Sequence, residues 1–332
     1  MARILVTGAS GFIGRHVVRK LLERGDQVKC LVRRPPQNGL AFPELEFVFG
    51  DITRPETLAA AVRGVDLVHH IAGATQVHSP WTFARVNSEG TRHLAEACAR
   101  LLNPPKLVYV SSLAAAGPSL PDSPRREGQP SAPISAYGRS KLAAEGYLKK
   151  LASQLPITVV RPPVAFGPGD PHTFKIFFGV KSGFNLVPGV VDPRMSLIYV
   201  EDMVSALILA AERGQILSQG PEDDRGIYFT SSEESLTYSE MGRAAAKALN
   251  VQVRTVRLPM LIFWLGAYAN QFVASLLRRP IVFNPDKVRE ALAGAWTCSS
   301  QKARVELGLE CTTSLTDGFR IMGEWYRREG WL

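Results

Sequence analysis

The sequence has little cysteine and no closely spaced cysteine pair. Its four cysteines are spread along 332 residues, and none belongs to a Cys-x-x-Cys motif. This spacing argues against a zinc site and against a disulfide framework, so we expect no bound metal. The opening MARILVTGAS also lacks the cationic start, apolar core and small-residue cleavage site of a signal peptide. The sequence therefore predicts a cytoplasmic protein.

The chain is basic, yet it has no long basic tract. Lys and Arg number 39 and Asp and Glu number 30, which gives a formal net charge of +9. Such a balance can suit nucleic acid, an anionic membrane or phosphorylated ligands. The positive residues are scattered, however, with short clusters such as Arg33-Arg34 and no interleaved aromatic residues. We therefore expect no nucleic-acid partner and interpret the charge as a solvated basic surface.

One apolar segment, residues 258–279, is nearly long enough to span a bilayer, but Asn270 and Gln271 interrupt it. Five large residues in it follow the spacing of an amphipathic helix: Leu261, Trp264, Leu265, Tyr268 and Phe272. That spacing predicts a helix packed over a substrate pocket. The alternative is peripheral contact with a membrane surface, with Arg278-Arg279 at the headgroups.

Short β-branched runs alternate with helical patterns in the first half, which predicts βαβ units around a parallel sheet. The predicted strands lie at residues 3–8, 27–32, 45–50, 65–73, 106–112 and 157–163, and the helical patterns at 13–24, 56–62, 82–102 and 136–151. After about Gly167 the pattern becomes irregular. We predict an α/β fold, with a Rossmann-type doubly wound parallel sheet in residues 1–166. Residues 167–332 should form mainly a smaller substrate-binding lobe, with segments that return to the first domain.

The motif VTGASGFIG ends the first predicted strand and opens the first predicted helix. A glycine turn lets the backbone approach a pyrophosphate, whose charge is met by free N–H groups at the helix N-terminus. The position between strand and helix therefore predicts dinucleotide binding. The candidate contacts in this loop are Gly8, Ser10, Gly11, Phe12, Ile13 and Gly14.

The end of the second predicted strand has no carboxylate. NAD-binding proteins tend to place Asp or Glu there, where it accepts hydrogen bonds from the adenosine ribose. Here Val32 is followed by Arg33 and Arg34, and two guanidinium groups suit a 2′-phosphate. The sequence thus favours NADP(H), with NAD(H) as the alternative.

The stretch SAYGRSKLAAE places Tyr137 four residues before Lys141, on one face of a predicted helix. None of the other seven tyrosines among the chain's eight has a lysine four residues on. Upstream, Ser111 and Ser112 end the fifth predicted strand, at the edge where parallel sheets carry ligand-facing groups. We therefore expect a serine, Tyr137 and Lys141 to meet in one crevice.

These three side chains suit the oxidation of a secondary alcohol beside a nicotinamide. A free tyrosine, with a pKa of about 10, is a poor base at neutral pH. A nearby ammonium and the positive nicotinamide ring favour the phenolate, while a serine hydroxyl can hold the substrate oxygen. In reduction the same groups act in reverse, with Tyr137 as the acid.

Along essentially the whole chain, these motifs resemble the extended branch of the short-chain dehydrogenase/reductase superfamily. TGASGFIG looks like its cofactor loop, and SSLAAAG followed by YGRSK matches its Ser-Tyr-Lys pattern. The resemblance assigns Ser112 as the catalytic serine from its distance to Gly117, and it makes Tyr137 and Lys141 cofactor contacts as well. Further implied cofactor contacts are Asp51 and Ile52 in GDITRP, Ala72 and Gly73 in HIAGAT, Asn87 in VNSEGT, and Pro163 and Val164 in RPPVAFGPGD. Asn87 has a second interpretation, in which it only braces its helix against a loop.

The resemblance also implies a homodimer, formed through helices at residues 82–102 and 136–151. Sugar dehydratases of this branch carry Thr-Asp-Glu where this chain has Ser112-Leu113-Ala114, so an elimination is disfavoured. The aromatic residues of the 258–279 segment favour an apolar ring system. The leading hypothesis is an NADP(H)-dependent dehydrogenase or reductase of a steroid-, terpenoid- or flavonoid-like small molecule. The alternatives are a nucleotide-sugar epimerase, to which Arg194 could supply a diphosphate contact, and a non-catalytic NADP-binding sensor or assembly protein.

Overall fold

A sheet of seven parallel strands forms the centre of the computed structural model, which describes residues 1–35, 42–77, 79–189, 192–220, 223–277 and 285–332. The strands lie in the order β10–β6–β5–β4–β1–β2–β3. Their bounds are β1 Arg3–Thr7, β2 Gln27–Val32, β3 Glu46–Phe49, β4 Leu67–His70, β5 Lys106–Val110, β6 Ile157–Arg161 and β10 Ile227–Phe229. The six predicted strands are therefore confirmed, and the second half of the chain adds β10.

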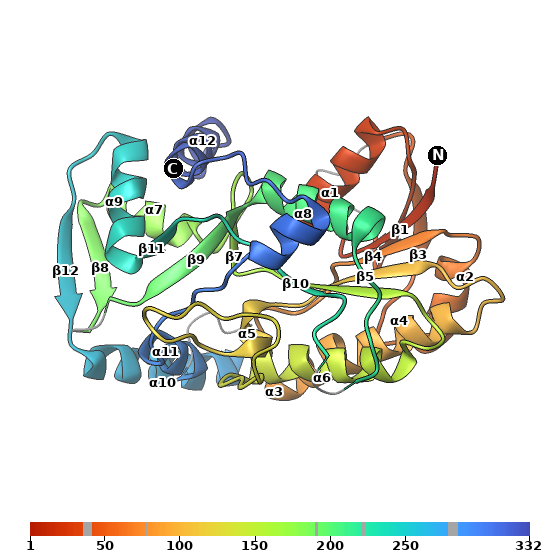
Figure 1. The fold of residues 1–332 in the computed structure, drawn as a ribbon. Helices are drawn as coiled ribbons and strands as arrows, with labels where there is room; N and C mark the ends of the chain where they lie inside the picture. Colours follow the sequence, from red (N-terminus) through yellow and green to blue (C-terminus); the bar gives the residue numbers. More distant parts are fainter. Residues whose placement is uncertain (36–41, 78, 190–191, 221–222, 278–284) are drawn as a thin grey trace.

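Helices cover both faces of this sheet, which explains why its strands are almost continuously apolar. One face packs against α1 (Phe12–Glu23) and α8 (Val200–Arg213), and the other against α2 (Leu58–Val62), α4 (Gly90–Ala99) and α6 (Ala136–Leu151) (Figure 1). The predicted α/β, doubly wound fold is confirmed. Strand β1 pairs with both β2 and β4, so the strand order reverses there and opens a crevice at the carboxyl ends of these strands.

The predicted helix at residues 82–102 forms three consecutive segments. They are α3 (Pro80–Phe83), a π-helical turn η2 (Ala84–Glu89) and α4, which ends at Ala99. Shorter helical elements elsewhere are η1 (Pro55–Thr57), α5 (Leu113–Ala116) and η3 (Ala303–Leu307). Wide π-helical turns inside helices are frequent at functional sites, and this one carries Asn87.

A second lobe lies beside the carboxyl ends of the strands (Figure 1). Its two small sheets are β11–β9–β7 and β12–β8. Their bounds are β7 Val164–Phe166, β8 Phe184–Pro188, β9 Arg194–Tyr199, β11 Ser235–Thr237 and β12 Arg254–Leu258; the lobe's helices are α7 Phe174–Lys181, α9 Tyr238–Leu249, α10 Met260–Leu277, α11 Pro285–Leu292 and α12 Leu315–Arg328. An aromatic core built around Phe166, Phe177 and Phe319 joins α7, α9 and α12.

The helix predicted within residues 258–279 is confirmed as α10, but its predicted packing face is wrong. Four of the five residues on that face are exposed, at 66% for Leu261, 62% for Leu265, 56% for Tyr268 and 66% for Phe272. Helix α10 is apolar around most of its circumference, so residue spacing alone does not identify the side that faces the protein. Arg278-Arg279 lie outside the described residues. Among the described helices, none combines the length and the apolar character needed to cross a bilayer.

Two helices approach closely at Gly138, near the beginning of α6. The Ser135 hydroxyl caps α6 by accepting the Gly138 N–H at 3.1 Å. A Cβ atom added to Gly138 would lie 2.2 Å from the carbonyl oxygen of Ala114 in α5. Glycine at this position therefore allows the start of α6 to contact the helix that follows β5.

We predict that Gly138→Ala destabilises the protein, because the added methyl group forces α5 and α6 apart. The free energy of unfolding should fall by about 1–3 kcal/mol, as for other overpacked contacts. Gly146→Ala is the matched control on the same helix, since nothing lies within 4 Å of its added Cβ. It should raise stability by up to about 1 kcal/mol through helix propensity. Urea denaturation measures both changes, and equal effects would contradict the close contact at Gly138.

Candidate active site

The glycine motif forms a tight turn between β1 and α1. Gly8 has a φ of +75°, and a Cβ atom on it would lie 2.7 Å from the backbone nitrogen of Ala72. Its carbonyl oxygen accepts the Gly11 N–H at 2.9 Å. A Cβ atom on Gly14 would lie 2.1 Å from that same oxygen. Each of Gly8 and Gly14 thus permits a backbone contact that a larger residue would block.

The first turn of α1 is open to an anionic ligand. The N–H groups in the first turn of a helix have no acceptor within the helix. Gly11, the N-cap of α1, has no side chain that could accept a hydrogen bond from them. Ser10 and Gly11 are exposed, Phe12 and Ile13 are half-buried, and the first turn has no acidic residue. These features suit an anionic group such as a pyrophosphate, and the contacts of these loop residues with a cofactor stay a prediction.

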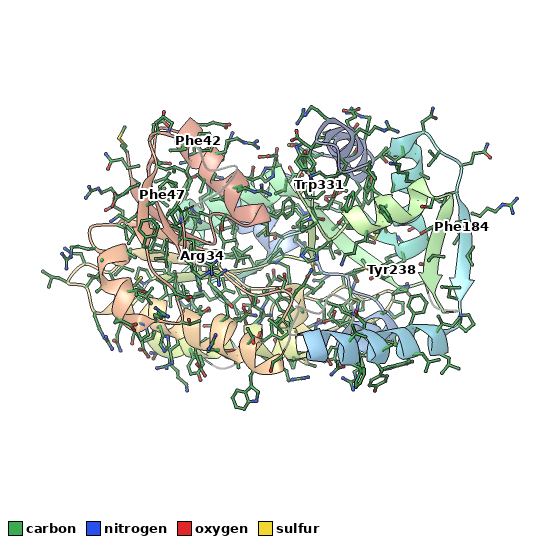
Figure 2. The ribbon with its side chains drawn as sticks, turned by 180° about the vertical axis from the view of Figure 1, so that it is seen from behind. Arg34, Phe42, Phe47, Phe184, Tyr238 and Trp331 are labelled. Atoms are coloured by element: carbon green, nitrogen blue, oxygen red, sulfur yellow. The ribbon has the colours of Figure 1, made fainter. Side chains whose placement is uncertain are left out.

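The predicted adenosine-side residues follow the neighbouring strands. Arg33 and Arg34 are exposed directly after β2, and Figure 2 labels Arg34 near the middle of the molecule. After β3, Asp51 accepts hydrogen bonds from the Thr53 N–H at 2.8 Å and from its hydroxyl at 2.9 Å. Ile52 is buried against Gly90. Asp51 therefore stabilises its own turn, and its contact with adenine stays a prediction.

A buried polar chain fixes the backbone after β4. The Thr7 hydroxyl contacts His70 Nδ1 at 2.7 Å and accepts the Ala72 N–H at 3.2 Å. His70 Nε2 contacts the Thr91 hydroxyl at 2.9 Å. Burial, together with the positive charge of Lys141, lowers the pKa of His70 to about 3. His70 is thus neutral at physiological pH and holds the loop that begins at Ala72.

Asn87 is fully buried and connects that loop to α6. Its Oδ1 accepts the Ala74 N–H at 2.7 Å, while its Nδ2 donates to the Ala74 carbonyl and to the Ser140 hydroxyl, each at 3.0 Å. These bonds are those expected of the bracing interpretation. A direct contact between Asn87 and a cofactor stays a prediction.

The two serines after β5 have different environments. The Ser111 hydroxyl is buried and donates to Glu145 Oε1 at 2.5 Å. The Ser112 hydroxyl caps α5 by accepting the Ala114 N–H at 3.1 Å, and it also hydrogen-bonds to Tyr137. The structure thus places Ser112 beside Tyr137, and its role as the catalytic serine stays a prediction.

Tyr137 is half-buried in the first turn of α6, with its ring edge-to-face against Phe83 at 5.7 Å. Burial raises the pKa of its hydroxyl above the ordinary value, and the hydrogen bond from Ser112 partly offsets this. Lys287 lowers the pKa of Tyr137 further and Glu290 raises it. The phenol is therefore protonated at neutral pH.

Lys141 is buried one helical turn after Tyr137. Its ammonium donates to the Val110 carbonyl at 2.8 Å and lies 4.9 Å from the centre of the Tyr109 ring. A Cβ atom on Gly73 would lie 3.2 Å from the Lys141 Nζ. The ammonium is thus directly beside the backbone predicted to lie under the dinucleotide.

Pro163 and Val164 are half-buried at the start of β7, and the carbonyl of the preceding Pro162 accepts the Leu113 N–H at 2.8 Å.

A buried ion pair behind the site was not predicted. Arg161 Nε donates to Glu145 Oε1 at 2.9 Å, and Arg161 Nη2 contacts Glu145 Oε2 at 2.5 Å. Glu145 also raises the pKa of Lys141, although burial has the larger, opposite effect. The sequence holds one usable signal, because Glu145 lies four residues after Lys141 on the same helical face. The pairing with Arg161 depends on the fold.

Helix α11 of the second lobe lies beside the start of α6, and the sequence did not predict this contact either. The Ala136 N–H donates to Asp286 Oδ2 at 3.0 Å, which joins α11 to the start of α6. Lys287 pairs with Glu290 at 2.6 Å, and both charges act on Tyr137. Lys287 also acts on Tyr238, which Figure 2 labels in this lobe. No sequence motif indicated this contact, because Ala136 and Asp286 are 150 residues apart along the chain.

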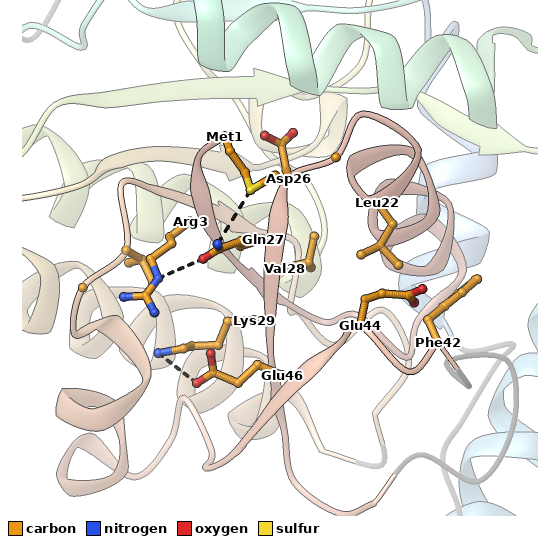
Figure 3. Close-up of a pocket in the computed structure, with 13 residues that line it drawn as sticks. Met1, Arg3, Leu22, Asp26, Gln27, Val28, Lys29, Phe42, Glu44 and Glu46 are labelled. Atoms are coloured by element: carbon orange, nitrogen blue, oxygen red, sulfur yellow. Dashed lines mark hydrogen bonds and ion pairs between the residues drawn. The ribbon is translucent and has the colours of Figure 1, made fainter.

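A hollow of about 520 Å³ lies elsewhere, at the amino ends of β1 and β2 (Figure 3). Arg3 donates to Gln27 across it at 3.1 Å, and Lys29 pairs with Glu46 at 3.3 Å. The hollow lies at the amino ends of the strands, whereas the glycine turn and Tyr137 lie at their carboxyl ends. It therefore contributes nothing to the candidate active site.

Comparison with known proteins identifies the family. A family model described as the NAD dependent epimerase/dehydratase family matches residues 4–220. The chain belongs to this family. It is an enzyme of the extended short-chain dehydrogenase/reductase type, as its motifs predicted.

Among the relatives of this family member, a ceramide reductase from Caulobacter vibrioides is 34% identical over 99% of this chain and 96% of the relative. A 3-beta-hydroxysteroid dehydrogenase from Mycolicibacterium neoaurum is 30% identical over 78% of this chain and 73% of the relative. A solved structure of UDP-glucose 4-epimerase from Thermus thermophilus in complex with NAD has a TM-score of 0.77, with 24% identity over 98% of this chain and 99% of that chain. This last likeness concerns the fold.

We predict that Lys141 makes stability rise with pH in an alkaline window. Burial lowers its pKa from 10.5 to about 8. Between these values the unfolded lysine holds a proton that the folded one has lost, so raising the pH favours the folded state. The free energy of unfolding of the wild type, minus that of Lys141→Met, should increase by on the order of 3 kcal/mol across this window.

Urea denaturation between pH 7 and 10.5 measures this difference, which should be flat below pH 8 because both states are then protonated. Lys150→Met is the control, since Lys150 is exposed on the same helix. A wild-type curve parallel to that of Lys141→Met over the whole range would contradict the assignment.

Proposed function

We propose that this family member transfers hydride between NADP(H) and a secondary alcohol or ketone on an apolar lipid or polycyclic substrate. The observation that carries the proposal is that Ser112 lies beside Tyr137, while Lys141, one helical turn later, lies beside the Gly73 backbone. The neighbouring Ala72 packs on Gly8 of the glycine turn. A protein that only senses or binds NADP would not need this arrangement of acid, hydroxyl and buried ammonium.

The bound nicotinamide would supply or accept the hydride. In reduction, the Tyr137 hydroxyl donates its proton to the substrate oxygen, and burial keeps this phenol protonated until then. Ser112 donates a hydrogen bond to the same oxygen while negative charge develops on it. The Lys141 ammonium stabilises the phenolate that remains. Oxidation uses the same groups in the opposite order.

Two observations support an apolar substrate over a nucleotide sugar. The relatives named for ceramide and steroid substrates are 34% and 30% identical to this chain. Arg194, the candidate diphosphate contact, donates instead to the Ser235 carbonyl at 2.6 Å and lies 3.6 Å from Glu240. Its guanidinium is therefore engaged within the second lobe.

We predict that Tyr137→Phe nearly abolishes turnover, by roughly 10²-fold or more, because the proton donor is lost. NADPH binding, followed by fluorescence titration, should stay within about twofold of wild type. The control is Tyr147→Phe, which removes a hydroxyl from the same helix and should keep full activity.

Turnover is followed through NADPH absorbance with a panel of ceramide-like and steroid ketones. Consumption of NADPH in proportion to ketone supports the proposal. Sugar interconversion without net NADPH consumption would assign an epimerase, and unchanged activity in Tyr137→Phe would exclude Tyr137 as the acid.

We propose NADP(H) as the preferred cofactor because Arg33 and Arg34 are exposed directly after β2, where no carboxylate is present. The double variant Arg33→Ala/Arg34→Ala should raise the KM for NADPH by about 10- to 100-fold, through loss of two charge-assisted contacts to the 2′-phosphate. The KM for NADH, which has no such phosphate, should change less than about threefold.

Initial-rate measurements with both cofactors test this preference. Arg63→Ala/Arg100→Ala is the control, because both of these arginines are exposed on the first domain and neither belongs to a predicted cofactor motif. A wild-type enzyme that prefers NADH, or a double variant that loses both cofactors equally, would contradict the NADP assignment.

A further inference from the structure

Helix α10 presents an unusual amount of apolar surface. Leu261, Ile262, Leu265, Tyr268 and Val273 are between 49% and 66% exposed. Figure 1 shows α10 along one side of the second lobe, at the lower edge of the molecule in that view. Single exposed apolar side chains are normal, but a run of them along one helix indicates an interaction surface.

Two further exposed aromatic residues lie elsewhere in the same lobe. Phe178 within α7 is 61% exposed, and Phe184, at the end of β8 away from α10, is 50% exposed. Strand β8 pairs with β12, and β12 leads directly into α10. On α10 itself, Trp264 and Tyr268 stack at 5.9 Å. Aromatic rings with polar edges are favoured where an apolar phase meets water.

The chain segment that contains α10 carries charges of one sign, and the acidic Asp286 and Glu290 of the adjoining α11 are paired with Arg289 and Lys287. From Met241 to Pro285 the sequence contains no Asp or Glu, whereas its basic residues there are Arg243, Lys247, Arg254, Arg257, Arg278 and Arg279. Arg254 and Arg257 are exposed on β12, the strand that leads into α10. A basic margin beside an apolar helix complements an anionic surface.

The surface is also connected to the active site. Helix α10 contacts α11, and α11 accepts the Ala136 N–H through Asp286 at the start of the helix that carries Tyr137. A surface bound against α10 would therefore lie close to α11 and to the start of α6, which carries Tyr137.

From this charge and exposure pattern we propose that α10 lies flat in the headgroup region of an anionic lipid bilayer. Its exposed apolar side chains enter the acyl boundary, and Arg254 and Arg257 contact acidic headgroups. The docking surface is thus α10 with the exposed side of β12. This inference does not rest on the proposed function, because docking requires neither cofactor nor substrate.

Co-sedimentation of the full chain with vesicles tests the proposal. Wild type should bind phosphatidylcholine vesicles containing phosphatidylglycerol at least about tenfold more strongly than pure phosphatidylcholine. Leu261→Glu/Leu265→Glu should weaken binding to the anionic vesicles by at least about tenfold, because two apolar side chains no longer enter the bilayer. Arg254→Gln/Arg257→Gln should weaken it by about tenfold.

Matched controls keep the result specific to α10. Leu102→Glu/Ile216→Glu introduces the same charges at exposed apolar residues around the seven-stranded sheet, and Arg63→Gln/Arg100→Gln removes the same charges there. Both controls should bind vesicles like wild type. Circular dichroism and NADPH binding show whether each variant is folded, and an unfolded glutamate variant is replaced by Leu261→Ser/Leu265→Ser, with the same expectation.

Three outcomes would overturn the proposal. The first is equal vesicle binding by wild type and the α10 variants, and the second is equal loss in the control variants. The third is a change from dimer to monomer in the α10 variants, seen by sedimentation velocity without vesicles, together with unchanged vesicle binding; α10 would then face a second copy of the chain. Activity toward a water-soluble ketone tests the proposed function separately, since it needs no vesicle.

Discussion

The buried ammonium group of Lys141 is the constraint on which the rest of the site depends. Removing an ammonium from water is strongly unfavourable unless other groups replace the lost solvation. Here the Val110 carbonyl, the Tyr109 ring and the Glu145 carboxylate take that role. Val110 and Tyr109 belong to β5, so α6 has to lie against the end of that strand. Tyr137, one turn earlier, is thereby held at the crevice.

Close backbone contacts make this arrangement possible. Gly138 lets α6 reach α5, and Gly73 leaves room for the lysine ammonium under the loop after β4. Gly8 does the same for the contact between the first turn and Ala72. The side-chain bonds of Asn87 then connect the Ala74 backbone to Ser140 in α6. The predicted cofactor-binding loops and the helix that carries Tyr137 and Lys141 are therefore one connected unit, and a change in either affects the other.

The sequence predicts what depends on local patterns. The six strands and the glycine turn follow from short motifs in their order along the chain, whereas the choice of Ser112 over Ser111 comes from the resemblance to the family. The sequence does not reveal contacts between distant segments, such as Arg161 with Glu145 or Asp286 with the start of α6. It also misplaces the packing face of α10, because an apolar helix offers no polar side to mark the solvent. Asn87 shows a third limit, since its residue type suits both a ligand contact and a brace.

The same burial that disfavours the Lys141 ammonium also suits the proton transfer proposed for Tyr137. Burial moves both groups toward their neutral forms, raising the pKa of Tyr137 and lowering that of Lys141. Below pH 8 the lysine is nonetheless mostly charged, so the resting pair is a neutral phenol and an ammonium. Once the phenol gives up its proton, two opposite charges lie one helical turn apart in a region of low dielectric, where their attraction is stronger than in water. The neighbouring charge thus has its largest effect on the phenolate and little effect on the resting phenol, which is the difference that catalysis requires.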